Sequence, residues 1–191
     1  IPLNNDKLAS MALDPVGKKP LRRFCPGSMI LSVGSFGCNL KCPFCQNHEI
    51  SMAGEADSRI VPVTPKHLAE KAADLRARGN IGVAYTYNEP MVGWGFVRDT
   101  ARLVRGAGMK NVIVTNGSVS GKVLDEVLPF TDAMNIDLKG FTDCYYGKLG
   151  GSLEVVKHFI EQAAAGCHVE LTTLIVHGEN DSEAELRELA A

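Results

Sequence analysis

Short apolar runs rich in valine and isoleucine alternate with helical patterns along this chain of 191 residues, and this alternation constrains the fold most. We expect strands at residues 29–33, 81–85, 112–114, 133–136 and 169–176. Such runs between helices are typical of parallel strands buried on both faces. Because parallel strands need crossover helices, the pattern predicts an α/β fold of about five strand–helix units. The sheet is either open and doubly wound or a full or partial barrel.

The expected helices carry their own start and stop signals. Thr64 is a good N-cap and Pro65 suits the first helical position. After the second expected strand, a helix is expected from about Val97 to Gly106. Two later helices are expected to begin near Ser120 and near Ser152. A final helix is indicated by the capping-box spacing of residues 182 and 185.

The chain divides into an N-terminal extension and one core domain. Residues 1–27 are rich in proline and glycine, so we expect an irregular extension there. Residues 28–191 form the expected core. The chain begins without methionine and ends in a helical pattern without a stop signal, so we expect a truncated core whose sixth strand–helix unit is missing.

Composition narrows the class of partner. The net charge of −2 gives no broad basic face, so we expect neither nucleic acid nor a membrane surface as a partner. No apolar run approaches the length of a membrane span. The six cysteines do not suit a small secreted disulfide scaffold, so we expect a reducing cytoplasmic setting with clustered thiols that serve a metal.

The clustered thiols are Cys38, Cys42 and Cys45, with the spacing C-x3-C-x2-C just past the first expected strand. Electron-transfer clusters and structural zinc usually take four protein ligands, so three cysteines leave one metal position open for chemistry. We therefore expect these cysteines to be both the metal ligands and the catalytic centre. The alternative is a structural zinc site with His48 as the fourth ligand.

Polar residues follow each of the other expected strands, where α/β enzymes place their reactive groups. Glu89 could accept a hydrogen bond from a ligand ammonium, and Asp137 suits ribose hydroxyls. Lys139 supplies a cation for a carboxylate, although Asp137 and Lys139 could also form an ordinary ion pair. The segment around Asn116 is also a good turn sequence. A further cluster, residues 177–181, follows the fifth expected strand.

The cysteine spacing, with Phe44 before the last cysteine, resembles the signature of the radical S-adenosylmethionine superfamily. The resemblance implies a full or partial (β/α) barrel and a 4Fe-4S cluster with one iron on each cysteine. In that family, S-adenosylmethionine chelates the fourth iron, and an electron from the cluster cleaves the sulfonium bond of S-adenosylmethionine to release a 5′-deoxyadenosyl radical that abstracts hydrogen. Phe44 is expected near the adenine.

Two groups within the superfamily are similar to this chain. Asn88-Glu89-Pro90 and Asp137-Leu138-Lys139 resemble motifs of pyruvate formate-lyase activating enzymes, although Tyr87-Asn88 replaces their double glycine. The N-terminal motifs, the cysteine loop through Gln46-Asn47 and the segment 85–90 resemble the radical enzyme of the AmmeMemoRadiSam system. The cofactor-binding residues implied in this way are Phe44, Gln46, Asn88, Glu89, Asn116, Asp137 and Lys139.

These observations favour a radical enzyme that abstracts hydrogen, with a glycyl-radical-enzyme activase as one possibility. The resemblance implies a reductant such as flavodoxin or ferredoxin and a possible protein substrate. The alternative is a non-catalytic iron–sulfur or zinc protein. A third hypothesis is a barrel enzyme that acts on phosphorylated metabolites. Such an enzyme needs a glycine-rich phosphate-binding loop after its late strands, and this sequence shows none there.

Overall fold

The computed structural model describes residues 6–54 and 60–190, so residues 1–5 of the expected extension lie outside the described residues. Its centre is a six-stranded sheet with the order β2-β3-β5-β6-β7-β8. The strands are β2 (Ser10–Pro15), β3 (Met29–Gly34), β5 (Asn80–Tyr85), β6 (Lys110–Thr115), β7 (Ala133–Asp137) and β8 (His168–Thr172). Within this sheet, β3, β5, β6, β7 and β8 are parallel, which confirms the predicted α/β class.

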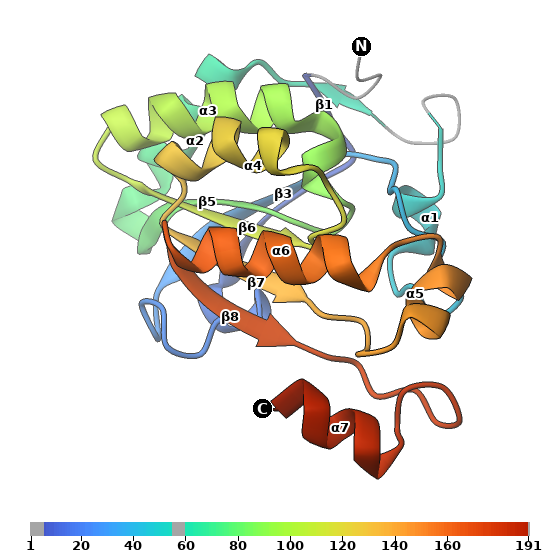
Figure 1. The fold of residues 1–191 in the computed structure, drawn as a ribbon. Coiled ribbons are helices and arrows are strands. Elements are labelled where there is room, and N and C mark those ends of the chain that lie inside the picture. Colours follow the sequence, from blue (N-terminus) through green and yellow to red (C-terminus); the bar gives the residue numbers. More distant parts are fainter. Residues whose placement is uncertain (1–5, 55–59, 191) are drawn as a thin grey trace.

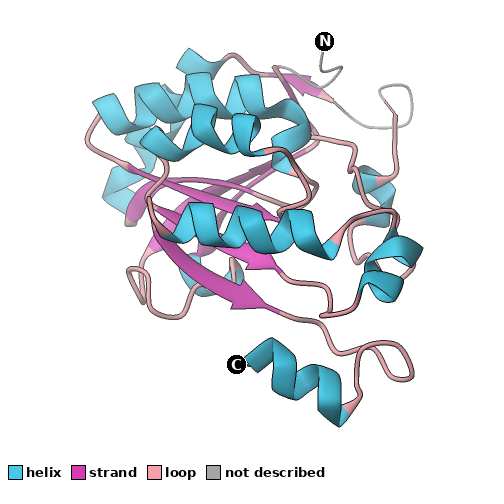
Figure 2. Cartoon of the chain, in the orientation of Figure 1, coloured by secondary structure: helices cyan, strands magenta, loops and turns pink. Residues whose placement is uncertain are grey.

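Helices follow the parallel strands and form a layer over one face of the sheet (Figure 1, Figure 2). This layer consists of α2 (Pro65–Asp74), α3 (Trp94–Gly106), α4 (Gly121–Val127) and α6 (Leu153–Ala164). Further helices lie at the ends of the sheet and beyond it: α1 (His48–Ser51), α5 (Asp143–Leu149) and α7 (Glu183–Ala190). Two strands, β1 (Lys7–Leu8) and β4 (Val61–Pro62), form a separate antiparallel pair.

The predicted helix starts match the structure where the signals were strongest. Thr64 is the N-cap of α2, and its hydroxyl accepts a hydrogen bond from the backbone N–H of His67. Ser152 caps α6 in the same way through the N–H of Val155. These side chains satisfy donors that the first helical turn leaves without partners.

The largest apolar cluster lies between the sheet and the helix layer. It joins strand residues such as Leu31, Val83 and Ile113 to helix residues such as Leu68 and Val104, all at most 2% exposed. Burial of each such side chain contributes about 1.5–3 kcal/mol to folding. The sheet is therefore held rigidly from its helical side, which fixes where the strand ends lie.

The opposite face of the sheet is covered by the N-terminal segment. Val16 and Leu21 from this segment pack on Ile30, Ala84 and Val112 of three neighbouring strands. The prediction of an irregular extension was wrong for residues 10–15, which form β2 antiparallel to β3. Pro15 and Asp14 obscure the strand pattern in the sequence, whereas the open edge of β3 supplies the hydrogen-bonding partner that makes it a strand.

Two further boundaries differ from the prediction. The fifth strand ends at Thr172 rather than near residue 176, because the chain leaves the sheet where Leu174 and Ile175 are exposed. The short helix α5 was not predicted; it begins at a Thr142 N-cap and ends at Gly150 with φ +80°.

Across residues 6–54 and 60–190, no helix is both long enough and apolar enough to cross a membrane.

Candidate active site at the carboxyl ends of the strands

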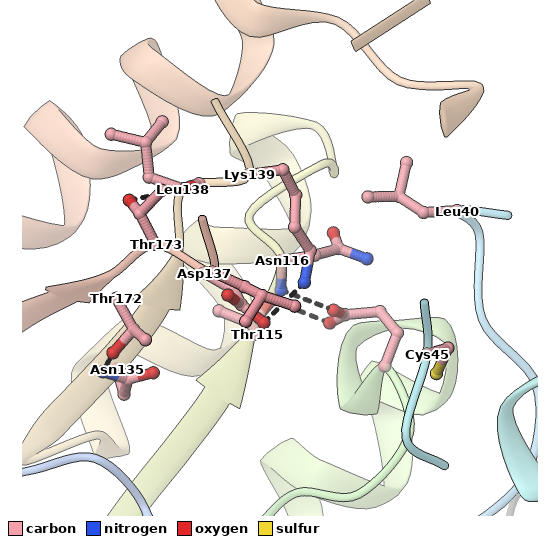
Figure 3. A network of polar contacts seen from close by, with 12 residues as sticks. Leu40, Cys45, Thr115, Asn116, Asn135, Asp137, Leu138, Lys139, Thr172 and Thr173 are labelled. Atoms are coloured by element: carbon pink, nitrogen blue, oxygen red, sulfur yellow. Dashed lines mark hydrogen bonds and ion pairs between the residues drawn. The ribbon is translucent and has the colours of Figure 1, made fainter. Parts of the chain in front are cut away.

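A cavity of about 390 Å³ opens at the carboxyl ends of the parallel strands. All ten predicted site residues line it: Cys38, Cys42, Phe44, Cys45, Gln46, Asn88, Glu89, Asn116, Asp137 and Lys139. They come from the loop after β3 and from the ends of β5, β6 and β7. Figure 3 shows part of this arrangement, with Asn116, Asp137 and Lys139 on one side and Cys45 on the other. The strand ends therefore bring together residues that lie up to about a hundred positions apart in sequence.

The cysteine loop is fixed to the rest of the protein by backbone hydrogen bonds. Gly37, with φ +85°, turns the chain after β3, and its N–H donates to the carbonyl of Ile50. The N–H of Lys41 donates to the carbonyl of Leu149 at the end of α5. A left-handed turn of this kind suits glycine, which has no Cβ to clash.

The three thiols in this loop are free and half-buried. The Sγ of Cys38 accepts hydrogen bonds from the N–H of Leu40 at 3.4 Å and from Asn116 Nδ2 at 3.6 Å. Cys45 Sγ lies 3.1 Å from the hydroxyl of Ser51. Burial raises the pKa of Cys38 to about 11 and also raises the pKa of Cys42. Thiolate ligands in such a loop are stabilised by the metal they bind and by these donors.

Three thiols from one loop line the same cavity, and this donor set suits a four-iron cluster with one thiolate on each of three irons. Among the residues that the structure describes, no three histidine, cysteine, aspartate or glutamate side chains converge on one metal position. A zinc ion needs its ligands around one centre, whereas each thiolate of a four-iron cluster binds a different iron. His48, the proposed fourth zinc ligand, is exposed, and it is absent from the residues that line the cavity.

Glu89 is the most deeply buried charged group of the site, at 2% exposure. Its Oε1 accepts from the hydroxyl of Thr115 at 2.7 Å and from the N–H of Met91 at 3.0 Å. Its Oε2 accepts from the N–H of Asn116 at 2.8 Å. Burial raises the pKa of Glu89, and the three donors oppose that shift. The carboxylate is thereby held at one orientation toward the cavity.

Asn88 performs a structural task that the sequence did not reveal. Its Oδ1 accepts from the N–H of Ser35, and its Nδ2 donates to the carbonyls of Phe36 and Gly37. The side chain therefore connects the turn after β5 to the start of the cysteine loop. Direct contact between Asn88 and a cofactor stays a prediction.

Asn116 is also engaged on both sides of its amide. Besides the contact with Cys38, its Nδ2 donates to Asn39 Oδ1 at 2.9 Å, and its Oδ1 accepts from the N–H of Ser118. The turn interpretation of this segment is confirmed by the contact with Ser118, and a cofactor-binding role for Asn116 stays a prediction. The side chain orders the loop and faces the cavity at once.

Asp137 and Lys139 lie two residues apart and form an ion pair, with 2.5 Å between Lys139 Nζ and Asp137 Oδ2. Burial disfavours the charge on Lys139, but Asp137 and the nearby cysteines raise its pKa above the ordinary value. Lys139 therefore stays cationic beside the cavity. Its backbone is fixed as well, because the N–H donates to the hydroxyl of Tyr146 and the carbonyl accepts from Asn180 Nδ2.

The aromatic residue of the cysteine motif has a partner. The ring of Phe44 lies 6.5 Å from that of Tyr145, with an interplanar angle of 13°. Tyr145 belongs to α5, the helix that the sequence did not predict. Gln46 lines the cavity nearby.

The cavity also includes residues that the sequence reasoning missed. Thr172 and Thr173 line it at the end of β8 (Figure 3), whereas the predicted cluster at residues 177–181 does not. The strand ends earlier than expected, so the residues at its true end occupy the site. Ser51 was missed too, although its position six residues after Cys45 places it within reach of the loop.

Comparison with known proteins identifies the family. A family model described as the Radical SAM superfamily matches residues 32–190. This chain belongs to the Radical SAM superfamily. Membership implies a 4Fe-4S cluster and S-adenosylmethionine as the cofactors, in agreement with the predicted pair. Which residues bind each group stays a prediction.

Two curated relatives of this Radical SAM protein cover most of its chain. An uncharacterized protein of Methanocaldococcus jannaschii is 39% identical over 181 residues, which are 94% of this chain and 53% of that protein. Pyruvate formate-lyase 1-activating enzyme of Escherichia coli strain K12 is 27% identical over 154 residues, which are 77% of this chain and 61% of the enzyme. The chain thus spans roughly half to three-fifths of the length of these relatives.

The solved structures confirm the predicted partial-barrel fold. SuiB of Streptococcus suis bound to S-adenosylmethionine superimposes with a TM-score of 0.62 at 18% identity, over 84% of this chain and 38% of SuiB. The mixed, mostly parallel sheet is therefore of the type found in radical SAM partial barrels. At this level of identity the likeness concerns the fold alone.

Proposed function

We propose that this chain holds a 4Fe-4S cluster on Cys38, Cys42 and Cys45 and cleaves S-adenosylmethionine reductively to abstract hydrogen from a substrate. The observation that carries the proposal is the convergence on one cavity of three free thiols, a buried carboxylate and an Asp–Lys pair. When bound, the cluster would supply the single electron that breaks the sulfonium bond. The remaining groups of the site act as ligands for the nucleotide.

Glu89 is suited to the amino group of the methionine moiety. An ionised carboxylate offers about four acceptor positions, and hydrogen bonds from Met91, Thr115 and Asn116 occupy three of them. One position is thus left for an ammonium donor. Because the donors already orient Glu89, binding would require little reorganisation of the side chain.

Asp137, Lys139 and Phe44 are suited to the rest of the nucleotide. Asp137 is about one-third exposed and can accept hydrogen bonds from ribose hydroxyls, while Lys139 offers its charge to the carboxylate of the methionine moiety. Phe44, braced by Tyr145, presents an aromatic edge or face to the adenine. Each group would bind without a change in the fold.

The substrate that loses hydrogen is inferred from the similarity to known relatives, and the cavity does not identify it. The similarity to an activating enzyme supports a glycyl-radical-enzyme activase, in which the substrate is a protein, and a flavodoxin or ferredoxin as the reductant. Asp14-Pro15 and Lys18-Lys19-Pro20, which resemble the AmmeMemoRadiSam enzymes, support that subgroup. The free cysteines of the described chain support a reducing, cytoplasmic setting.

The test is anaerobic reconstitution with iron and sulfide, followed by reduction with dithionite in the presence of S-adenosylmethionine. The proposal predicts 5′-deoxyadenosine, detected by liquid chromatography, from the unaltered protein and from a Cys144→Ala control, whose thiol is exposed and lies off the cavity. Cys42→Ala should abolish the product. A reconstituted cluster that never yields 5′-deoxyadenosine would favour a non-catalytic iron–sulfur protein instead.

A further inference from the structure

A polar cluster beside the predicted site links the N-terminal segment to the cavity, which half-buried Tyr87 also lines. We call it the Asp14 cluster; it consists of Asp14, Lys19 and Tyr87. Lys19 Nζ lies 3.0 Å from Asp14 Oδ2, and the Tyr87 hydroxyl donates to the same oxygen at 2.7 Å. The Lys19 ammonium also lies 4.5 Å from the centroid of the Tyr87 ring. The Lys19 side chain is only 3% exposed.

The members of this cluster satisfy one another. Lys18 adds a third hydrogen bond to Asp14. Burial opposes ionisation of Asp14, but the hydrogen bonds from Tyr87 and Lys19 lower its pKa below the ordinary value. A buried charge pair of this kind is tolerated only where both partners are hydrogen-bonded. The three side chains therefore hold one another in place and leave little capacity for a ligand.

Tyr87 has an unusual backbone that needs such support. Its φ is +74°, in the left-handed region that bulky residues rarely adopt. Gly34 makes room for it, since a Cβ at Gly34 would lie 2.9 Å from the Cβ of Tyr87. Backbone conformations of this kind persist where the surroundings over-determine them, and they gather at functional sites.

The turn that Tyr87 opens carries two residues of the site. Asn88 connects to the cysteine loop, and Glu89 is held by Thr115 and Asn116. Both side chains depend on the direction in which the chain leaves Tyr87. A shift at Tyr87 would therefore move the carboxylate and the cysteine loop together.

We propose that the Asp14 cluster is a positioning device that sets the affinity for S-adenosylmethionine by holding Asn88 and Glu89 through the strained turn at Tyr87. The inference rests on the proposed function, because it assumes that the nucleotide binds in this cavity. It makes the N-terminal strand part of the binding site, and it makes Tyr87 a positioning residue.

The test compares Tyr87→Phe with a matched control, Tyr85→Phe. Both changes remove one phenolic hydroxyl from neighbouring parts of the chain. Tyr85 donates to Asn111 within the helix-side core and does not line the cavity. Affinity for S-adenosylmethionine is measured by calorimetry on the full chain with its cluster reconstituted and no reductant present. Hydrogen exchange at the amides of Met91 and Asn116 is measured without nucleotide.

Tyr87→Phe is expected to weaken binding about 3- to 10-fold, the effect of losing roughly one hydrogen bond, and to speed exchange at both amides by a similar factor. Tyr85→Phe should leave both quantities unchanged, even if it lowers thermal stability. Unaltered exchange, or unaltered affinity, in Tyr87→Phe overturns the inference alone. Failure of the parent protein with its cluster to bind the nucleotide at all overturns the proposed function, and the affinity claim with it.

Discussion

Glu170 anchors the N-terminal segment, and its replacement by glutamine gives a prediction whose size follows from the structure. Its carboxylate accepts hydrogen bonds from the consecutive backbone N–H groups of Arg22, Arg23 and Phe24, and it lies 2.9 Å from His168 Nε2. The side chain belongs to β8 and is 16% exposed. Glu170 thus connects β8, at one edge of the sheet, to the N-terminal segment that covers the face opposite the helix layer.

Glu170→Gln keeps the size of the side chain but turns one acceptor into a donor. The new amide group faces at least one backbone N–H, so one charge-assisted hydrogen bond is lost. Such a bond is worth about 1.5–3 kcal/mol when buried, and partial exposure reduces this to about 1–2 kcal/mol. For a chain of this size, each kcal/mol corresponds to roughly 2–4 °C, so the melting temperature should fall by about 2–8 °C.

The acid dependence gives a second signature. Burial alone would raise the pKa of Glu170, but the hydrogen bonds from His168 and the backbone lower it from 4.5 to about 2. A lowered carboxylate pKa contributes stability above the unfolded value and loses it as the pH falls toward the folded value. The stability difference between the two proteins should therefore shrink between pH 4.5 and pH 2.

Urea denaturation followed by circular dichroism, at pH 7 and at several acidic pH values, measures both effects. Glu161→Gln is the control for loss of a surface charge, because Glu161 is exposed on α6 and its carboxylate makes no hydrogen bond within residues 6–54 and 60–190. Equal stability of Glu170→Gln and the parent at pH 7 would refute the anchoring role. A stability difference that stays constant into acid would refute the assigned pKa.

Three other changes probe the sheet, the binding site and the loop. Gly82→Ala should cost about 3 kcal/mol or more, because its Cβ would overlap the Lys110 carbonyl; near-parent stability in urea would contradict the strand packing. Glu89→Gln should weaken S-adenosylmethionine binding at least about 10-fold in calorimetry, since the charged acceptor is lost, and unchanged affinity would count against its role. Asn88→Ala removes the bonds to Ser35, Phe36 and Gly37 and should lower iron content after reconstitution; full iron loading would show that the loop needs no such support.

The parallel strands were predictable because each is a short run of apolar residues between helical patterns. Burial on both faces makes the run itself diagnostic, and no long-range information is needed. Strand β2 lacks that signature. Asp14 within it points to Lys19 and Tyr87, a polar arrangement that exists only once β2 has paired with β3.

The site was predictable for a different reason. In parallel α/β sheets, the residues after each strand share one edge, so polar residues at strand ends can be placed together from sequence order alone. This logic failed where a strand boundary was misjudged, at Thr172. It also could not find the Asp14 cluster, because Asp14 and Tyr87 are 73 positions apart and only one of them follows a parallel strand.

In the proposed function, three protein thiolates leave one iron of a 4Fe-4S cluster without a protein ligand. Mössbauer spectroscopy of the ⁵⁷Fe-reconstituted protein, with and without S-adenosylmethionine, tests it most directly. About one quarter of the iron signal should change on addition of the nucleotide, while the rest stays as it was. Four iron sites that do not respond, in a protein with an intact cluster, would contradict it.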